Sequence, residues 1–107
     1  MISVVGGLIV DDFAWLTEWY ASQCNGDWEH TYGVNLTNLD NPGWSLTVDL
    51  KDTDLEKCAF AAVEHNLTSD VSWWTCRVKD NKFEAQCGSR DLLSVLAIFR
   101  VWAESPS

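Results

Sequence analysis

The spacing of apolar residues along this chain of 107 residues begins with a helical pattern. Side chains recur every three or four positions at Phe13, Leu16, Tyr20 and Cys24. Asp11 or Asp12 can cap this helix, because a short acidic side chain accepts a hydrogen bond from a free backbone N–H of the first turn. The Asn25-Gly26 pair ends it, since glycine suits the left-handed conformation that follows many helices. We therefore predict a helix that runs to about Cys24.

After this helix the apolar period changes to two, which predicts strands. The first alternating run consists of Trp28, His30, Tyr32, Val34 and Leu36. Asp40-Asn41-Pro42-Gly43 then predicts a tight turn, because proline presets φ and glycine accepts a positive φ. The second alternating run consists of Trp44, Leu46, Val48 and Leu50. Together these residues predict a hairpin with one apolar face.

A second hairpin is predicted in the C-terminal half of the chain. Its inward residues are Trp74, Cys76 and Val78 in one strand and Phe83, Ala85 and Cys87 in the other. Asp80-Asn81 makes the turn between them. Between the two hairpins, residues 52–70 predict a short irregular segment and a strand around residues 60–64.

The chain closes with a second amphipathic helix. Ser89 is its predicted cap, and Asp91 is predicted to lie in the first turn, near the positive end of the helix dipole. The buried stripe is formed by Leu92, Leu96, Phe99 and Ala103, flanked by Leu93, Val95 and Trp102. The order of elements predicts an α+β fold. In it, an antiparallel sheet of four to five strands, built from two hairpins, carries the N-terminal and C-terminal helices on one face.

Length and composition predict a single domain over residues 1–107, since this length suffices for one core and 47% of the residues are apolar. Residues 1–12 are interpreted as an N-terminal extension, either a mis-set start or an extra edge strand. No apolar run reaches the roughly 18 residues that a membrane span needs. Residues 1–10 also lack the basic segment and cleavage site of a signal peptide. We therefore expect a cytoplasmic protein that has no membrane partner.

The net charge of −9 lies entirely in the first half of the chain. Residues 57–107 contain six acidic and six basic residues, whereas residues 1–56 contain one base, Lys51. The ten acids of that half are Asp11, Asp12, Glu18, Asp27, Glu29, Asp40, Asp49, Asp52, Asp54 and Glu56. Such acidity argues against a nucleic-acid partner, whose phosphates require Lys and Arg. It favours a basic protein partner, with mere solubility as the alternative.

The four cysteines, Cys24, Cys58, Cys76 and Cys87, are too widely spaced for a zinc site, so we expect no metal and no cofactor. We predict reduced, mostly buried thiols. A thiolate followed by glycine and arginine, as at residues 87–90, would suggest sulfur or phosphoryl chemistry. This loop is too short to surround an oxyanion, and we interpret Cys87 as a strand-end residue.

Asp27, Glu29 and His30 place two carboxylates and an imidazole within four residues. In a strand, Glu29 and His30 would point to opposite faces and could not bind one metal ion. A structural role or a partner contact is therefore favoured over catalysis. Trp73 and Trp74 are adjacent, so one of them should face away from the core and mark a contact surface.

The chain also resembles a known family, the immunity protein 53 family of bacterial polymorphic toxin systems, over roughly residues 13–104. The resemblance rests on Trp15-Leu16, Trp19-Tyr20, Cys24-Asn25-Gly26-Asp27-Trp28-Glu29-His30, Tyr32-Gly33, Leu39-Asp40-Asn41-Pro42-Gly43-Trp44, Trp74, Cys76, Phe83 and the closing helix through Trp102. It implies a small cytoplasmic antidote that binds one cognate toxin domain and blocks it.

Combining the resemblance with the charge, we predict an inhibitor without catalytic residues that covers a basic toxin surface, such as the substrate groove of a nuclease. The predicted toxin-binding residues form an acidic, aromatic-rich face and are Asp27, Glu29, Asp40, Asn41, Trp44, Asp49, Asp52, Asp54 and Trp73. We expect a monomer or a weak homodimer. Two alternatives remain open: a small hydrolase or sulfurtransferase-like enzyme that uses His30 or Cys87, and a homodimeric scaffold.

Overall fold

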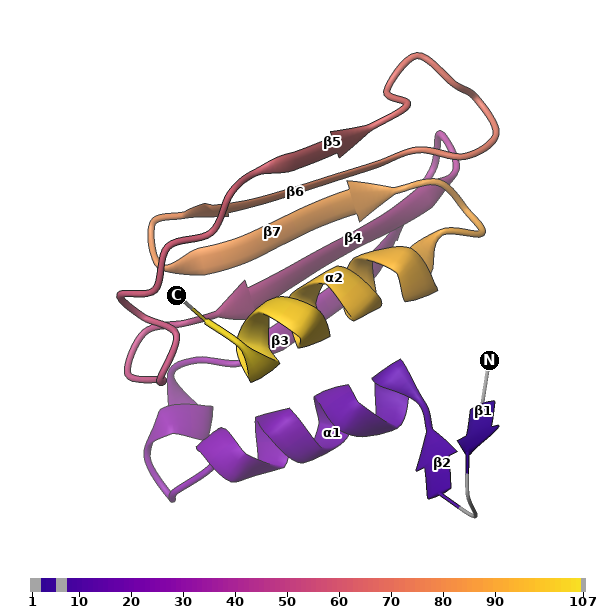
Figure 1. Ribbon diagram of the computed structural model, residues 1–107. Helices are drawn as coiled ribbons and strands as arrows, with labels where there is room; N and C mark the ends of the chain where they lie inside the picture. Colours follow the sequence, from indigo (N-terminus) through magenta and orange to yellow (C-terminus); the bar gives the residue numbers. More distant parts are fainter. Residues whose placement is uncertain (1–2, 6–7, 107) are drawn as a thin grey trace.

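The computed structural model describes residues 3–5 and 8–106, and it has two helices on one side of an antiparallel sheet (Figure 1). The elements in chain order are β1 (Ser3–Val5), β2 (Leu8–Val10), α1 (Asp12–Gln23), the 3₁₀ helix η1 (Trp28–His30), β3 (Val34–Leu39), β4 (Gly43–Asp49), β5 (Val63–His65), β6 (Trp74–Lys79), β7 (Lys82–Cys87) and α2 (Leu92–Glu104). The predicted fold class is confirmed.

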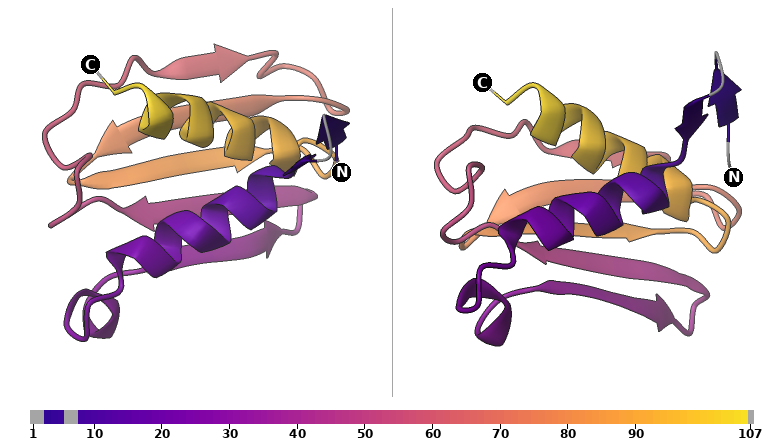
Figure 2. Two further views of the ribbon diagram at one scale, coloured as in Figure 1. Left: turned by 60° about the horizontal axis from the view of Figure 1, so that its bottom comes forward. Right: turned by 90° about the horizontal axis from the view of Figure 1, so that it is seen from below.

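The main sheet has five strands in the order β3-β4-β7-β6-β5, and every neighbouring pair is antiparallel. The two predicted hairpins lie side by side, with β4 and β7 paired in register from Trp44 opposite Cys87 to Asp49 opposite Lys82. Both helices cover the same face (Figure 2). No helix of the described residues covers the other face.

The N-terminal strands do not extend this sheet. β1 and β2 pair with each other and form a separate two-stranded sheet. The prediction of an extra edge strand is therefore wrong for the described part of residues 1–12; residues 1–2 and 6–7 lie outside the described residues.

Helix α1 begins and ends where its sequence signals lie. The Asp11 side chain accepts a hydrogen bond of 3.0 Å from the Phe13 backbone N–H, which satisfies one free donor of the first turn. Gly26, just past the helix, has φ of +90°, a conformation that side chains with a Cβ rarely adopt. The predicted helix is confirmed.

The first hairpin is present but shorter than predicted at its start. β3 begins at Val34, and the preceding Trp28, His30 and Tyr32 are not in a strand, so that part of the prediction is wrong. At the other end, β4 begins with Gly43 beside β7. A Cβ there would collide with the Cys87 carbonyl oxygen, which explains the need for glycine.

The second hairpin is confirmed. Asp80 and Asn81 have φ of 54° and 60°, which is the left-handed pair that a two-residue hairpin turn requires. The fifth strand, β5, begins at Val63 rather than near Phe60. Phe60 instead packs edge-on against Phe83, with ring centroids 5.5 Å apart, because its apolar ring is needed in the core.

The N-cap of helix α2 lies two residues later than predicted. Asp91, not Ser89, is the N-cap residue, and its side chain does not cap the helix. The Asp91 carboxylate is 8% exposed and instead accepts hydrogen bonds from Ser72 Oγ at 3.0 Å and from the Trp73 backbone N–H at 3.1 Å. Asp91 therefore attaches the segment before β6 to the start of α2.

The core lies between the helices and the inward side chains of the sheet. Its fully buried residues include Leu46, Val48, Leu50, Phe83, Ala85, Leu96 and Phe99. Trp15 and Trp19 of α1 pack edge-on against Phe99, with ring centroids 5.7 and 5.2 Å away. The inward alternation predicted for β4, β6 and β7 is thus confirmed, and so is the buried stripe of α2 at Leu96 and Phe99.

The carboxylate of Asp91 generates the first testable prediction. Asp91→Ala leaves two partly buried donors, Ser72 Oγ–H and Trp73 N–H, without this acceptor, so we expect the free energy of unfolding to fall by about 2 kcal/mol. Asp70→Ala removes the same charge at an exposed position and should change it by less than about 0.5 kcal/mol. Chemical denaturation of both variants measures this difference. Equal stabilities would contradict the attaching role of Asp91.

Candidate functional site

Acidic side chains gather at one end of the sheet, where η1 and the loop after β4 meet. η1 follows α1 through a tight turn held by two side chains. Asn25 Oδ1 accepts hydrogen bonds from the backbone N–H groups of Asp27 at 3.0 Å and Trp28 at 2.9 Å. The Glu29 carboxylate accepts from those of Asn25 at 2.9 Å and Gly26 at 2.8 Å. These local bonds replace the strand that the alternation predicted.

The reciprocal bonds also change the acidity of Glu29. Hydrogen bonds from its own backbone N–H, and then from those of Asn25 and Gly26, lower the pKa of Glu29 below its usual value of 4.5. The Glu29 carboxylate therefore stabilises the turn in addition to contributing negative charge to the surface. Asp27 and His30, by contrast, are exposed on either side of it.

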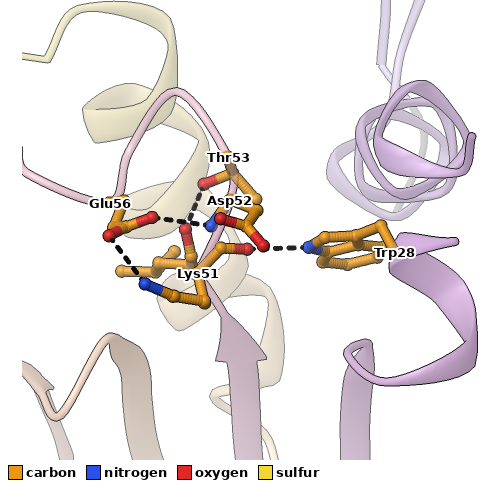
Figure 3. Close-up of polar contacts among 6 residues, drawn as sticks. Trp28, Lys51, Asp52, Thr53 and Glu56 are labelled. Carbon is orange, nitrogen blue, oxygen red and sulfur yellow. Dashed lines mark hydrogen bonds and ion pairs between the residues drawn. The ribbon is translucent and has the colours of Figure 1, made fainter.

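Trp28 joins η1 to the rest of the molecule. Its side chain is 4% exposed, and its ring lies edge-on to Trp19 and Tyr20, with centroids 6.4 and 6.0 Å away. The indole Nε1–H donates a hydrogen bond of 2.9 Å to the backbone carbonyl of Lys51 (Figure 3). This bond holds η1 against the loop that follows β4.

That loop, residues 50–56, is held by a second carboxylate. Glu56 accepts a hydrogen bond of 2.8 Å from the Asp52 backbone N–H and pairs with Lys51 Nζ at 3.4 Å (Figure 3). The Asp52 backbone N–H, and then Lys51, lower the pKa of Glu56 below 4.5. Asp52 itself has φ of 62°, a conformation that Asp tolerates better than most residues. The Asp52 and Asp54 side chains are left exposed.

A polar cleft of about 260 Å³ opens between η1 and this loop. It is lined by Asn25, Asp27, Trp28, Thr31, Tyr32 and Asp52. Asp27 and Asp52 stand at this cleft, and among the described residues neither forms an ion pair. The cleft therefore combines two free carboxylates with a partly aromatic lining.

Asp49, at the end of β4, is also at this end of the sheet but is already engaged. Its carboxylate accepts a hydrogen bond of 2.9 Å from the Gly33 backbone N–H and pairs with Lys82 Nζ at 3.6 Å. We therefore separate Asp49, which fixes the start of β3, from the three free carboxylates of Asp27, Asp52 and Asp54.

The remaining predicted residues lie at the opposite end of the hairpin. Asp40 and Asn41 are exposed in the β3–β4 turn. Trp44 is half-buried, and its Nε1–H donates to the Ser89 carbonyl at 3.1 Å. Trp73 is half-buried beside Gly88 and lines a pocket of about 650 Å³ together with Asn41 and the outward side chains of β6 and β7.

The structure thus divides the predicted face into two groups. Six to seven strand residues separate them, or roughly 20 Å at the usual rise per residue. The sequence pattern placed most of these residues on the first hairpin, and it did not indicate Tyr32 or Glu56 as toxin-binding residues. Glu56 could have been found as the carboxylate four residues after Asp52 in a loop, whereas Tyr32 was misassigned to a strand.

Cys87, one residue of the enzyme alternative, lies in surroundings that disfavour a nucleophilic thiol. Cys87 is fully buried, and burial, followed by the charge of Asp91, raises its pKa to about 11, whereas a nucleophilic thiol needs a low pKa. Among residues 3–5 and 8–106, no three His, Cys, Asp or Glu side chains lie close enough to hold a metal ion. None of the helices described is long and apolar enough to cross a membrane.

The fold and this acidic end are compatible with a small binding protein, and comparison with known families specifies the class. The family model described as "Immunity protein 53" matches residues 13–104, most of the chain. The chain therefore belongs to the immunity protein 53 family, and this membership implies that it neutralises a cognate toxin. No curated protein and no solved structure matches the chain.

The two buried thiols give a prediction that also tests the enzyme alternative. All four cysteines are free; Cys76 and Cys87 are fully buried, with pKa values raised mainly by burial to about 12 and 11. In native protein at pH 8, a thiol reagent should therefore modify only the half-buried Cys24 and Cys58 quickly. All four should react in denaturant without prior reduction. Rapid modification of Cys87 in the native state would revive a catalytic role.

The second prediction from this site concerns the pH dependence of stability. The lowered pKa of Glu29 means that its carboxylate stabilises the fold above pH 4.5 and loses this effect as the pH falls through its folded pKa. Glu29→Gln should lower the melting temperature at pH 7, and the gap to the parent should narrow below pH 4.5. Glu18→Gln, at an exposed position of α1, is the control and should show no such gap.

Proposed function

We propose that this immunity protein neutralises its toxin by steric and electrostatic blockade, binding through the acidic end formed by η1 and loop 50–56. The observation that carries the proposal is the polar cleft lined by Asp27 and Asp52, which form no ion pair with any described residue; Asp54, in the same loop as Asp52, is also exposed. The carboxylates of Glu29 and Glu56 hold the backbone in place. The surface is thus preorganised before the toxin arrives.

The chemistry of the cleft supports a basic partner. A lysine or arginine that enters it would meet two carboxylates and the partly exposed ring of Tyr32. Carboxylates pair with either cation, and aromatic faces attract both, arginine more often. A toxin whose substrate is a nucleic acid must present such side chains in its groove, because phosphates require them. A nuclease is therefore the toxin activity that the charge favours.

The second group of predicted residues is proposed as a separate contact. Asp40, Asn41 and Trp73 lie around the pocket at the other end of the hairpin, with Trp44 close by in β4. A standard interface covers about 800 Å² on each partner, so it is roughly 30 Å across and could include both ends. We propose that the acidic end directs association and that Trp73 supplies buried contact area.

In this proposal the protein carries out no reaction, needs no cofactor and acts in the cytoplasm as a monomer or a weak homodimer. The raised pKa and burial of Cys87 support inhibition over catalysis. We also propose that the chain forms a single immunity domain and that residues 1–12, which precede the family match, are an extension to it.

Association kinetics test the role of the acidic end. Replacing Asp27, Asp52 and Asp54 by asparagine together should lower the association rate about tenfold at low salt and flatten its salt dependence, since steering depends on the local charge. Asparagine also tolerates the positive φ at position 52. The partner is the toxin domain encoded by the neighbouring gene, and the measurement is stopped-flow mixing.

A matched triple variant keeps the total charge equal. Glu18→Gln, Glu64→Gln and Glu104→Gln remove three exposed charges outside the proposed toxin-binding residues. This control should keep most of the parent's association rate. Equal losses in both triples would mean that only net charge matters, and no loss in either would leave the acidity as a solubility feature.

A further inference from the structure

The outer edge of β3 presents unpaired backbone groups. β3 ends the main sheet, and in an antiparallel pair only alternate residues bond to the neighbouring strand. The Asp49 N–H donates to Gly33 O at 3.0 Å, and the Leu50 N–H donates to Asn81 O at 2.8 Å. Odd-numbered residues of β4 therefore bond to β3, and even-numbered ones bond to β7.

It follows that Asn35, Thr37 and Leu39 of β3 bond to β4, because they pair with the odd-numbered residues of that strand. The backbone N–H and C=O groups of Val34, Leu36 and Asn38 then point away from the sheet. Among the described residues, no backbone hydrogen bond from another segment reaches these groups. Figure 2 shows β3 as the outermost strand, with open space along its outer side.

This edge also lacks the features that normally prevent pairing with another chain. Natural edge strands are kept short or carry lysine, proline or inward-pointing charges. β3 has six residues and the sequence VNLTNL, with no charge and no proline. The other edge strand, β5, has three residues and carries Glu64 at its centre.

An apolar groove runs beside the same edge. It has a volume of about 360 Å³, lies between α1 and β3, and is lined by Phe13, Leu16, Thr17, Tyr20, Gly33, Val34 and Leu36. Phe13, Tyr20 and Leu36 are each 37% exposed. Leu36 faces the helices with its partner Leu46, so a strand added beside it would place every second side chain against this groove.

The charge around the β3 edge indicates whether a second copy of this chain or a different partner would pair with it. Residues 1–50 contain no Lys or Arg, whereas Asp27 and Glu29 precede β3 and Asp40 follows it. If a second copy paired through the same edge in antiparallel fashion, Asp40 of each copy would approach Asp27 and Glu29 of the other. A parallel arrangement would bring the two Asp40 side chains together. Both arrangements oppose like charges, so the charge disfavours a second copy.

We propose that the β3 edge binds an extended segment of the cognate toxin as an additional antiparallel strand. The segment has alternating apolar side chains that enter the α1–β3 groove and basic side chains at its ends, near Asp27 and Asp40. Main-chain hydrogen bonds supply affinity in this mode of recognition, and the groove supplies specificity. The inference rests on the proposed function, since it names the surface by which the toxin is held.

Hydrogen exchange tests the proposal without altering the chain. In the free protein, the amides of Val34, Leu36 and Asn38 should exchange quickly, and those of Asn35 and Thr37 should be protected by β4. Adding the toxin domain encoded by the neighbouring gene should protect the first three and leave the Glu64 amide unchanged. Concentration-dependent protection of the same amides in the free protein would show that a second copy occupies the edge, and would overturn the proposal.

Matched proline variants supply an independent test. Asn38→Pro removes one outward N–H and should weaken toxin binding about tenfold, the effect of one lost hydrogen bond. Glu64→Pro is the control: it is opposite Thr75, which bonds to β7 because the Gly88 N–H donates to Trp73 O, so its N–H also points outward. Circular dichroism checks that both variants fold.

The outcomes separate the two proposals. Toxin binding without protection of the β3 amides, or with equal effects of both prolines, would overturn strand addition and leave toxin binding intact. If the parent protein does not bind the toxin domain in calorimetry, the proposed function fails and the inference fails with it. If Asn38→Pro does not fold, Leu36→Ser in the groove replaces it, with Val101→Ser on α2 as its exposed apolar control.

Discussion

Phe99 is the side chain through which both helices are attached to the sheet. It is fully buried in α2 and contacts Trp15 and Trp19 of α1, while its ring lies 4.9 Å from that of Phe83 in β7. α1 therefore depends on an aromatic contact with α2 as well as on its contacts with the sheet. Because aromatic pairs stabilise beyond the area that they bury, a single ring can join three elements. Removing it would remove contacts with all three elements at once.

The acidic end depends on the same aromatic network. Trp19 touches Phe99 on one side and Trp28 on the other, and Trp28 hydrogen-bonds the Lys51 carbonyl. A chain of contacts thus leads from the core to loop 50–56, which also buries Leu50 and Leu55 in the core. Among the described residues, Asp27 and Asp52 form no ion pair within this framework. The position of the proposed binding surface therefore depends on the packing of Trp19 and Trp28 in and beside the core.

The sequence predicted the fold well because its elements are locally specified. Capping at Asp11, the positive φ at Asp80 and Asn81, and the alternation along β4 all act within a few residues. Two predictions failed where side-chain hydrogen bonds determine the local structure. Asn25 and Glu29 bond to nearby backbone and turn Trp28–His30 into a 3₁₀ helix. The start of α2 lies at Asp91 rather than at the predicted cap Ser89, and the Asp91 carboxylate bonds to the distant Ser72 and Trp73. Periodicity does not reveal such bonds.

The site was less predictable than the fold, because it depends on contacts between distant residues. The approach of Asp52 to Asp27 comes from the Trp28–Lys51 bond, which spans 23 residues and has no local signal. Conversely, Asp27 and Asp40 are close in sequence but lie at opposite ends of β3. Counting acids therefore identified the charged half of the chain, and only the structure showed how its charges are divided.

The acidic side chains fall into two groups, those that bond to the protein's own backbone and those that form no ion pair with the described residues, and the two groups suggest different reasons for the acidity. Glu29 and Glu56 bind backbone N–H groups and stabilise their turns, so the fold itself accounts for them. Asp27 and Asp52 line one small cleft, so two negative charges are placed at a single site. Solubility alone would be served equally well by dispersed charges. The proposed cationic partner would account for this placement, because its charge would be complementary to both carboxylates.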